Sequence, residues 1–171
     1  MYDKKILNEQ LISSTVEIAK EAGKAITEIY NSDFDYQLKK DSSPITAADN
    51  LSHNIITDRL KILTPEIPIL SEENCDIPYK IRSQWTQYWL VDPLDGTKEF
   101  IKKNGEFTVN IALIENNNPI FGVIHLPITN EIYWGSQVSG SFYSNESSDV
   151  EPISVSKNNQ NPIRIVASRS H

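Results

Sequence analysis

Residues 89–100 of the chain are Trp-Leu-Val-Asp-Pro-Leu-Asp-Gly-Thr-Lys-Glu-Phe, and this stretch says more about the fold than any other. The apolar run 88–91 predicts a buried strand that ends at Asp92. Pro93 cannot donate a ladder hydrogen bond, so regular strand pairing is expected to stop there. Asp95 follows one tight turn later, which places a second carboxylate close to the first.

Gly96 and Thr97 stand where a short helix over 97–103 is expected to begin. The first backbone N–H groups of a helix lack partners within it and attract anions such as phosphate. Asp92 and Asp95 lie three residues apart around the preceding turn, so both carboxylates can be aimed at one point. Mg²⁺ prefers oxygen ligands and commonly joins one or two carboxylates to a substrate phosphate. The stretch therefore predicts a metal-assisted phosphate site.

The length and composition are those of a globular protein with one sizeable core. The chain has 171 residues, of which 39% are hydrophobic and 23% charged. A net charge of −7, without any cluster of Lys and Arg beyond a local pair, argues against a nucleic-acid-binding surface. The same negative charge favours bound cations in a protein that handles an anionic phosphate.

Cysteine content and hydropathy predict a cytoplasmic protein. Cys75 is the only cysteine, which excludes an internal disulfide and a cysteine-based zinc cluster, and it is interpreted as an incidental thiol. The N-terminal residues lead into no long apolar segment, and no stretch approaches the roughly 18–20 apolar residues of a membrane span. We therefore expect neither a secretion signal nor a transmembrane segment.

Two helices are expected in the first third of the chain. Apolar residues recur at helical spacing over 8–30, which indicates one buried helical face. The apolar residues Leu51, Ile55, Ile56, Leu60 and Leu63 indicate a second helix, which Pro65 stops. Thr46 with Asp49 three residues later resembles the pair that caps a helix start, although Glu or Gln is commoner at the second place.

The rest of the chain is dominated by strand patterns. Strands are expected over 34–38, 67–70, 88–91, 107–114, 120–126, 131–134 and 141–143. Residues 74–86 are expected to be irregular and anchored by Trp85, and the polar segment 144–151 to be a linker. A further strand over 163–167 ends the chain. Two helices followed by mostly antiparallel strands predict an α+β layered domain.

Each acidic element has a plainer interpretation of its own. Glu72 and Glu73 after a strand suit a solvated turn, and Asp95 suits a cap on the next helix. Asp49 suits a helix cap and nothing more. Their joint occurrence with the Gly96–Thr97 pair is what favours a metal and phosphate site.

The chain resembles the inositol-monophosphatase-like superfamily of Mg²⁺-dependent, lithium-sensitive phosphatases. The elements that carry the resemblance are Ser71-Glu72-Glu73, the stretch 92–97 and the upstream segment 44–49. Residues 98–113 bring it closer to the bacterial 3′(2′),5′-bisphosphate nucleotidases, which remove the 3′-phosphate of adenosine 3′,5′-bisphosphate to give AMP. The resemblance covers nearly the whole chain and implies the N-terminal half of a layered sandwich, with two helices packed on a mostly antiparallel sheet.

The resemblance implies a set of metal ligands. Glu72 and Asp92 match the ligands of a first Mg²⁺, together with the backbone carbonyl of Leu94. Asp92 and Asp95 match ligands of a second Mg²⁺. Mg²⁺ is therefore the expected cofactor.

The resemblance also implies catalytic and substrate-binding residues. Asp49 matches the partner of the Thr97 hydroxyl, and this pair, with Glu72, is expected to orient a water and take up its proton. The substrate contacts are expected from Glu72, Leu94, Asp95, Gly96 and Thr97, with Lys39 near the site. His53, His125 and His171 have no part in this scheme and are interpreted as surface or core-edge residues.

The family has another acidic ligand in a Trp-Asp-x-Ala motif of its C-terminal domain, and this sequence holds no Trp-Asp pair. We therefore expect residues 1–150 to form a metal- and phosphate-binding α+β domain. Residues 151–171 are expected to be a linker and the first strand of a truncated C-terminal α/β domain. On this hypothesis the chain binds Mg²⁺ weakly, turns over slowly and exposes an apolar surface where the second domain would dock.

Alternatives stay open for the activity and the partners. An inositol monophosphatase or sugar bisphosphatase is the nearest alternative, and a catalytically inactive remnant that binds metal or nucleotide is the other. The expected partner is a small-molecule nucleotide bisphosphate. A homodimer, a separate chain that supplies the missing half, and weak peripheral association with the cytoplasmic face of the inner membrane are also left open.

Overall fold

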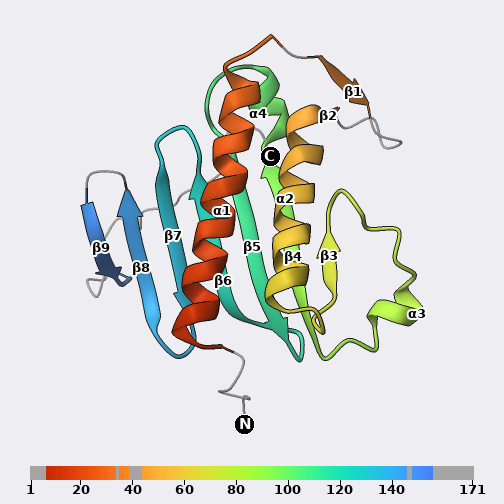
Figure 1. The fold of residues 1–171 in the computed structure, drawn as a ribbon, viewed down its shortest axis with the longest axis vertical. Coiled ribbons are helices and arrows are strands. Elements are labelled where there is room, and N and C mark those ends of the chain that lie inside the picture. The colour runs from red at the N-terminus through yellow and green to blue at the C-terminus, as the bar shows by residue number, and fades with distance from the viewer. Residues whose placement is uncertain (1–6, 34, 39–43, 146–147, 156–171) are drawn as a thin grey trace, which may run out of the picture.

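The computed structural model describes residues 7–33, 35–38, 44–145 and 148–155 (Figure 1). Its elements in chain order are α1 (Glu9–Tyr30), β1 (Tyr36–Leu38), β2 (Pro44–Thr46), α2 (Ala47–Leu63), β3 (Ile69–Ser71), α3 (Tyr79–Arg82), β4 (Gln87–Asp95), α4 (Thr97–Ile101), β5 (Thr108–Glu115), β6 (Asn118–Leu126), β7 (Glu131–Ser136), β8 (Gly140–Asn145) and β9 (Ser148–Ile153). Strands β3 to β9 form one seven-stranded sheet in chain order, and β1 and β2 pair separately. The predicted α+β fold is confirmed.

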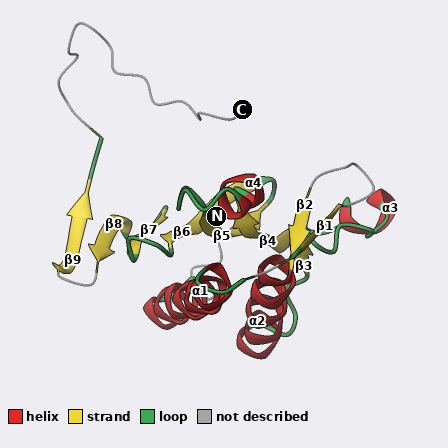
Figure 2. Ribbon diagram, turned by 90° about the horizontal axis from the view of Figure 1, so that it is seen from above, coloured by secondary structure: helices red, strands yellow, loops and turns green. Residues whose placement is uncertain are grey.

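Helices α1 and α2 lie side by side on one face of the sheet (Figures 1 and 2). Helix α1 begins after Asn8, whose side chain accepts a hydrogen bond of 2.9 Å from the Leu11 amide. Its apolar stripe, which includes the fully buried Ile26, faces the sheet. On the outer side, Arg59 of α2 makes a bidentate ion pair with Glu21 of α1. The periodicity of the sequence thus predicted the helix-bearing layer.

The face of the sheet under α1 and α2 forms the core. From β4 to β9, each strand pairs antiparallel with the next one along the chain. Strand β3 pairs parallel with β4. Alternate residues of β5 are buried, as Val109, Ile111 and Leu113 show, whereas β8 and β9 at the far edge of the sheet contain no buried residue. Trp89 of β4 is also fully buried, and its indole N–H donates to Thr64 Oγ1 at 2.9 Å.

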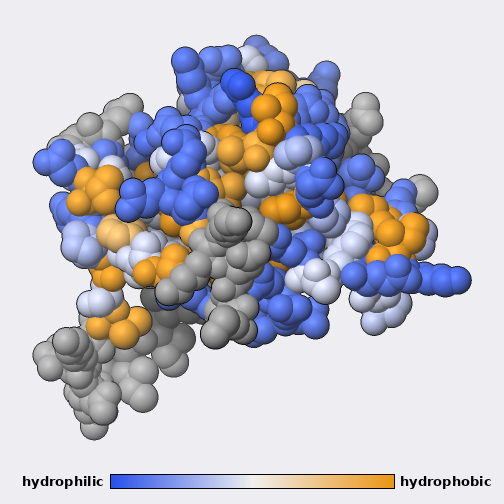
Figure 3. Space-filling model, turned by 60° about the horizontal axis from the view of Figure 1, so that its bottom comes forward, coloured by the Kyte–Doolittle hydropathy of each residue, from blue (hydrophilic) through white to orange (hydrophobic). Residues whose placement is uncertain are grey.

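The opposite face of the sheet is open among the described residues. Leu90 of β4 is 43% exposed and Ile124 of β6 is 48% exposed, so the expectation that 88–91 forms a buried strand was wrong for Leu90. Apolar side chains also break the polar surface in several places on the face shown in Figure 3. Within the described residues, no helix combines the length and apolar character that crossing a membrane requires.

Three local predictions need correction. Strand β4 does not end at Asp92 but continues to Asp95, with its register to β5 shifted between these two residues. The segment 144–151 is mostly strand, because β9 pairs antiparallel with β8. A helical turn, α3, interrupts the irregular segment, and Trp85 there contacts the Tyr88 ring at 5.9 Å and is only half-buried. The strand expected over 163–167 lies outside the described residues.

Candidate metal and phosphate site

The site begins where two parallel strands end at the same edge of the sheet. β3 ends at the buried Ser71, which pairs with Val91 of β4. The next amide, that of Glu72, donates to the Val91 carbonyl at 3.0 Å. Because parallel strands carry their carboxyl ends to one edge, Glu72 arrives beside Asp92. The parallel pairing therefore brings together two acidic residues that are twenty positions apart.

Asp92 is held in an environment that disfavours its negative charge. Burial is the largest effect that raises the pKa of its carboxyl, to about 7, and the charges of Glu72 and Asp95 raise it further. Hydrogen bonding to the Glu72 carboxyl acts in the same direction, whereas the Leu94 backbone opposes it. Asp92 Oδ1 is buried and has no hydrogen-bond partner among the described residues. A cation would relieve both the crowding and the unpaired oxygen.

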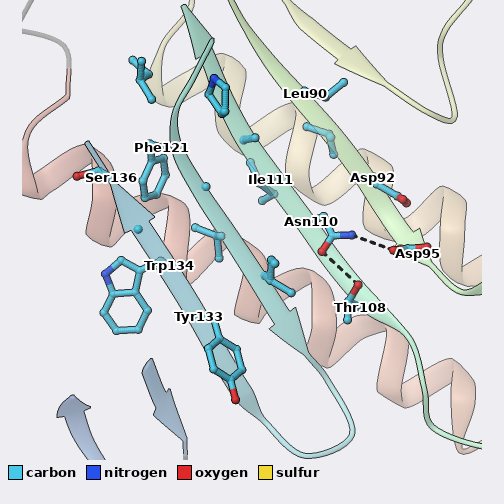
Figure 4. Close-up of a pocket in the computed structure, with 18 of the residues that line it drawn as sticks. Leu90, Asp92, Asp95, Thr108, Asn110, Ile111, Phe121, Tyr133, Trp134 and Ser136 are labelled. Carbon is cyan, nitrogen blue, oxygen red and sulfur yellow. Dashed lines mark hydrogen bonds between the residues drawn. The ribbon is translucent and has the colours of Figure 1, made fainter. Parts of the chain in front are cut away.

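Asp95 lies on the exposed side of the turn (Figure 4). Its Oδ2 accepts a hydrogen bond of 3.3 Å from Asn110 Nδ2, and Asn110 Oδ1 accepts one of 3.1 Å from Thr108 Oγ1. Both partners belong to β5. Helix α4 starts after Gly96 with no side-chain cap, so Asp95 is not the helix cap that its plainer interpretation predicted.

Gly96 lets the chain turn from β4 into α4. Its φ is +96°, a conformation that glycine adopts most readily, and a Cβ there would lie 2.9 Å from the Glu106 carbonyl oxygen. Thr97, the first residue of α4, donates its hydroxyl to Asp49 Oδ1 at 2.9 Å. The Thr97 hydroxyl also lies 3.3 Å from the Leu94 carbonyl oxygen.

Asp49 joins the start of α2 to the start of α4. It is fully buried, and its Oδ2 accepts hydrogen bonds of 2.7 Å from both the amide and the hydroxyl of Thr46. The capping pair predicted from sequence is present, and the same carboxylate holds Thr97 through its other oxygen. Three hydrogen bonds at the positive end of α2 compensate the burial of this charge.

Two polar residues of α2 also face this region and were missed in the sequence. Ser52 donates its hydroxyl to the Pro93 carbonyl at 2.7 Å, and His53 Nδ1 forms a hydrogen bond of 2.8 Å with Ser71 Oγ. Burial lowers the pKa of His53, nearby Lys61 lowers it further, and Asp58 opposes them. Their spacing from Asp49, three and four positions on, was the signal that places them on its helix face.

The predicted carboxylates are gathered only in part. Glu72 and Asp92 adjoin, and Asp95 is near enough to act on Asp92 electrostatically, but it hydrogen-bonds to Asn110. Among the described residues, no group of three or more His, Cys, Asp or Glu side chains stands ready as a metal cluster. The donor set still fits a hard cation, because it is all oxygen, negatively charged and includes one unpaired oxygen. Lys39 lies outside the described residues.

An open groove of about 1200 Å³ runs from these carboxylates across the uncovered face of the sheet. Asp92 and Asp95 lie along its β4 side, and Tyr133 and Trp134 of β7 lie on the far side (Figure 4). Its floor is made by the small residue Gly122 of β6 and its neighbours. The acidic group is therefore accessible from the face opposite α1 and α2.

The sequence matches the inositol monophosphatase family over residues 7–171. The chain belongs to the inositol monophosphatase family. It is 46% identical over 164 residues to the curated 3′(2′),5′-bisphosphate nucleotidase CysQ of Escherichia coli K12, a match that covers 94% of this chain and 64% of that protein. It is 45% identical to CysQ of Buchnera aphidicola over 80% of this chain and 49% of that one.

Solved structures of the family have the same fold. The crystal structure of CysQ from Bacteroides thetaiotaomicron superposes with a TM-score of 0.74 at 35% identity, over 98% of this chain and 65% of that one. The inositol monophosphatase TM1415 of Thermotoga maritima also gives a TM-score of 0.74, at 23% identity, and supports the fold alone. The chain thus spans about two thirds or less of the length of these relatives.

Proposed function

We propose that this chain carries the metal- and phosphate-binding part of a Mg²⁺-dependent 3′(2′),5′-bisphosphate nucleotidase. Such an enzyme hydrolyses the 3′-phosphate of adenosine 3′,5′-bisphosphate to AMP and phosphate. The observation that carries the proposal is the Asp92 carboxyl, whose buried Oδ1 is unpaired and which the charges of Glu72 and Asp95 both affect, beside the Thr97–Asp49 pair. The identity to CysQ proteins supports the nucleotide substrate over other phosphate esters.

The acidic residues are assigned to the cation. Glu72, Asp92 and Asp95 would hold Mg²⁺ with their carboxylates, and Leu94 would add its carbonyl oxygen. Bound Mg²⁺ would neutralise negative charge on the phosphoryl group and lower the pKa of a water molecule. In the absence of a cation, the raised pKa of Asp92 leaves its carboxyl partly protonated near pH 7. A bound cation would favour its ionised form.

The Thr97–Asp49 pair is assigned to proton movement. The Thr97 hydroxyl points its hydrogen at Asp49 Oδ1, which leaves its oxygen lone pairs free to accept a hydrogen bond from a water molecule. Asp49 is held rigidly by Thr46 and is in place to take up a proton that arrives through the hydroxyl. The amides of Gly96 and Thr97 would seat the phosphate.

The division of the chain is also part of the proposal. Residues 1–150 would form the metal- and phosphate-binding domain, and the residues after them would begin a further α/β unit. A boundary at residue 150 would cut strand β9, which ends at Ile153, so the boundary is better placed just beyond that strand. The open face of the sheet would be covered by that further unit. A cytoplasmic location, with or without peripheral attachment to the inner membrane, belongs to the same proposal.

The first test is cation binding by the chain itself. Glu72→Gln should abolish Mg²⁺ or Mn²⁺ binding in isothermal titration calorimetry, because it removes a charged ligand without changing size. The adjacent Glu73→Gln is the matched control and should leave the affinity nearly unchanged. Equal affinities in the unmutated chain and Glu72→Gln would contradict the assignment.

The second test is substrate choice. The chain fused to the remaining third of Escherichia coli CysQ should release phosphate from adenosine 3′,5′-bisphosphate faster than from an inositol monophosphate or a sugar bisphosphate. The unfused chain should be far slower, because it spans only 64% of the length of that relative. A preference for inositol phosphate or sugar bisphosphate would favour the nearest alternative, and nucleotide binding without turnover by the fusion would favour an inactive remnant.

A further inference from the structure

Helix α2 touches three separate segments of the acidic site through one face. Asp49, Ser52 and His53 stand at positions i, i+3 and i+4, so their side chains share one side of the helix within about 6 Å of axial length. Each forms a hydrogen bond with a different segment: Asp49 with α4, Ser52 with the turn in β4, and His53 with the end of β3. One face of α2 is therefore hydrogen-bonded to both segments that precede or carry the other acidic residues of the site, the end of β3 and the turn in β4.

Ser52 fixes the turn that separates two of the carboxylates. Its buried hydroxyl donates to the Pro93 carbonyl at 2.7 Å, across 41 positions of sequence. Pro93 lies between Asp92 and Asp95, in the interval where the register of β4 to β5 shifts. A strand whose ladder is interrupted needs another restraint, and the Ser52 hydroxyl supplies one at that place.

His53 fixes the residue before the third carboxylate. Its Nδ1 lies 2.8 Å from Oγ of Ser71, a side chain that is only 2% exposed. Glu72 follows directly and is exposed, so the position of its backbone beside Asp92 depends on how firmly the end of β3 is held. The Glu72 amide bonds to Val91 on the other side, which leaves the His53–Ser71 bond as the restraint from the helix layer.

We infer that Ser52 and His53 are positioning residues that set the separation of Glu72 from Asp92 and Asp95, and so the affinity of the site for a divalent cation. The inference rests on the proposed function, because it takes these carboxylates as the cation ligands. Neither residue is assigned a contact with substrate or with the ion.

The test is the affinity for Mn²⁺, followed by electron paramagnetic resonance, in four variants of the full chain. Ser52→Ala removes the hydroxyl and is tolerated by a helix, and His53→Leu removes the imidazole. Both should weaken Mn²⁺ binding about tenfold. His53→Asn keeps a hydrogen-bonding group near the position of Nδ1 and should restore most of the affinity, whereas His53→Gln, whose amide lies nearer the position of Nε2, should not.

Thr15→Val is the matched control for loss of a buried hydroxyl. Thr15 is fully buried in α1 and donates to the Leu11 carbonyl at 2.8 Å, away from the acidic site. It should lower thermal stability by an amount similar to Ser52→Ala and leave Mn²⁺ affinity unchanged. If Thr15→Val weakened Mn²⁺ binding as much as Ser52→Ala does, general destabilisation would explain both losses, and the inference would be overturned.

The remaining outcomes separate this inference from the proposed function. Unchanged Mn²⁺ affinity in Ser52→Ala and His53→Leu, with binding abolished by Glu72→Gln, would overturn the positioning role alone. Equal losses in His53→Asn and His53→Leu would do the same for the His53 hydrogen bond. An unmutated chain that binds no Mn²⁺ at millimolar concentration, or a Glu72→Gln variant that binds normally, would overturn both.

Discussion

The two faces of the seven-stranded sheet are made by the same strands but differ in what they bury. Under α1 and α2, Trp89 and Ile111 are almost wholly enclosed, whereas on the other face their neighbours Leu90 and Asn110 reach solvent. Side chains alternate between the faces, so a one-residue slip of register would exchange core and site. Packing against α1 and α2 on one face is therefore enough to stabilise the sheet, and the open face can carry acidic side chains that lack a compensating partner.

The largest test of this contrast is a pair of adjacent truncations in β4. Trp89→Ala should lower the free energy of unfolding by about 3–5 kcal/mol, because it empties a packed volume and removes the partner of Thr64. Leu90→Ala, one residue along, should cost less than about 1 kcal/mol. Urea unfolding followed by circular dichroism measures both. Similar losses would show that the open face is covered in solution.

A pair of glycine replacements compares the same two faces with smaller expected losses of stability. A Cβ on Gly23 of α1 would overlap the imidazole of His125, so Gly23→Ala must displace either that buried ring or the helix. We expect a loss of about 1–3 kcal/mol in the free energy of unfolding. At Gly122, on the open face, the nearest atom would be the Ile111 carbonyl oxygen at 3.9 Å, and alanine should be tolerated. Thermal melts of the two variants should differ clearly, and matching melting temperatures would contradict the close approach of α1 to β6.

The charge on the open face should make stability depend on pH. The pKa of Asp92 rises from 3.8 to about 7 on folding, so the folded state holds the proton more tightly than the unfolded state. Without a cation, stability should therefore fall as pH rises from 4 to 7 and level off above. Asp92→Asn should remove this slope and stabilise the chain at pH 8 on the order of 1 kcal/mol, after allowance for partial exposure and screening. Unfolding in the presence of a chelator at several pH values measures it. A wild-type slope retained by the variant would exclude Asp92 as its source.

A group on the covered face should make stability depend on pH in the opposite direction. Burial lowers the pKa of His125, against the opposing effects of Asn130 and the Ala19 carbonyl, and Lys20 lowers it slightly more. The unfolded chain therefore takes up this proton first, and stability should be lost as pH falls below about 6.5. His125→Asn should flatten the acid side of the profile in the same unfolding experiment. If the variant loses stability at low pH as the unmutated chain does, a group other than His125 causes that loss.

Regular patterns in the sequence predicted the covered face well. The helical spacing over 8–30 predicted α1 to within one residue, because one continuous buried stripe runs along the whole helix. The apolar run at 88–91 misled at Leu90, because such a run suits a strand buried on both faces and only one face is covered here. The polar composition of 144–151 predicted a linker and not strand β9, because an exposed edge strand contains few apolar residues.

The site was predictable where a motif is local and not where distant segments meet. Asp49, Asp92 and Asp95 stand in compact motifs, and the pairing of Thr97 with Asp49 was expected from the family resemblance. The roles of Ser52 and His53 were not predicted, because their hydrogen-bond partners lie 41 and 18 positions away in sequence and meet them only in the folded chain. No pattern of residue types marks a backbone carbonyl such as that of Pro93 as a partner.

The shared carboxylate of Asp49 ties the beginning of one helix to the beginning of another. One oxygen of Asp49 accepts hydrogen bonds from Thr46 and the other accepts one from Thr97, so a change at position 49 affects both the start of α2 and the Thr97 hydroxyl. In a mutational scan, loss of activity at position 49 would combine misfolding with lost chemistry and could not be assigned to either. During divergence of the sequence, positions 46, 49 and 97 should behave as one inherited unit, with a change at any of them tolerated only when the others change too.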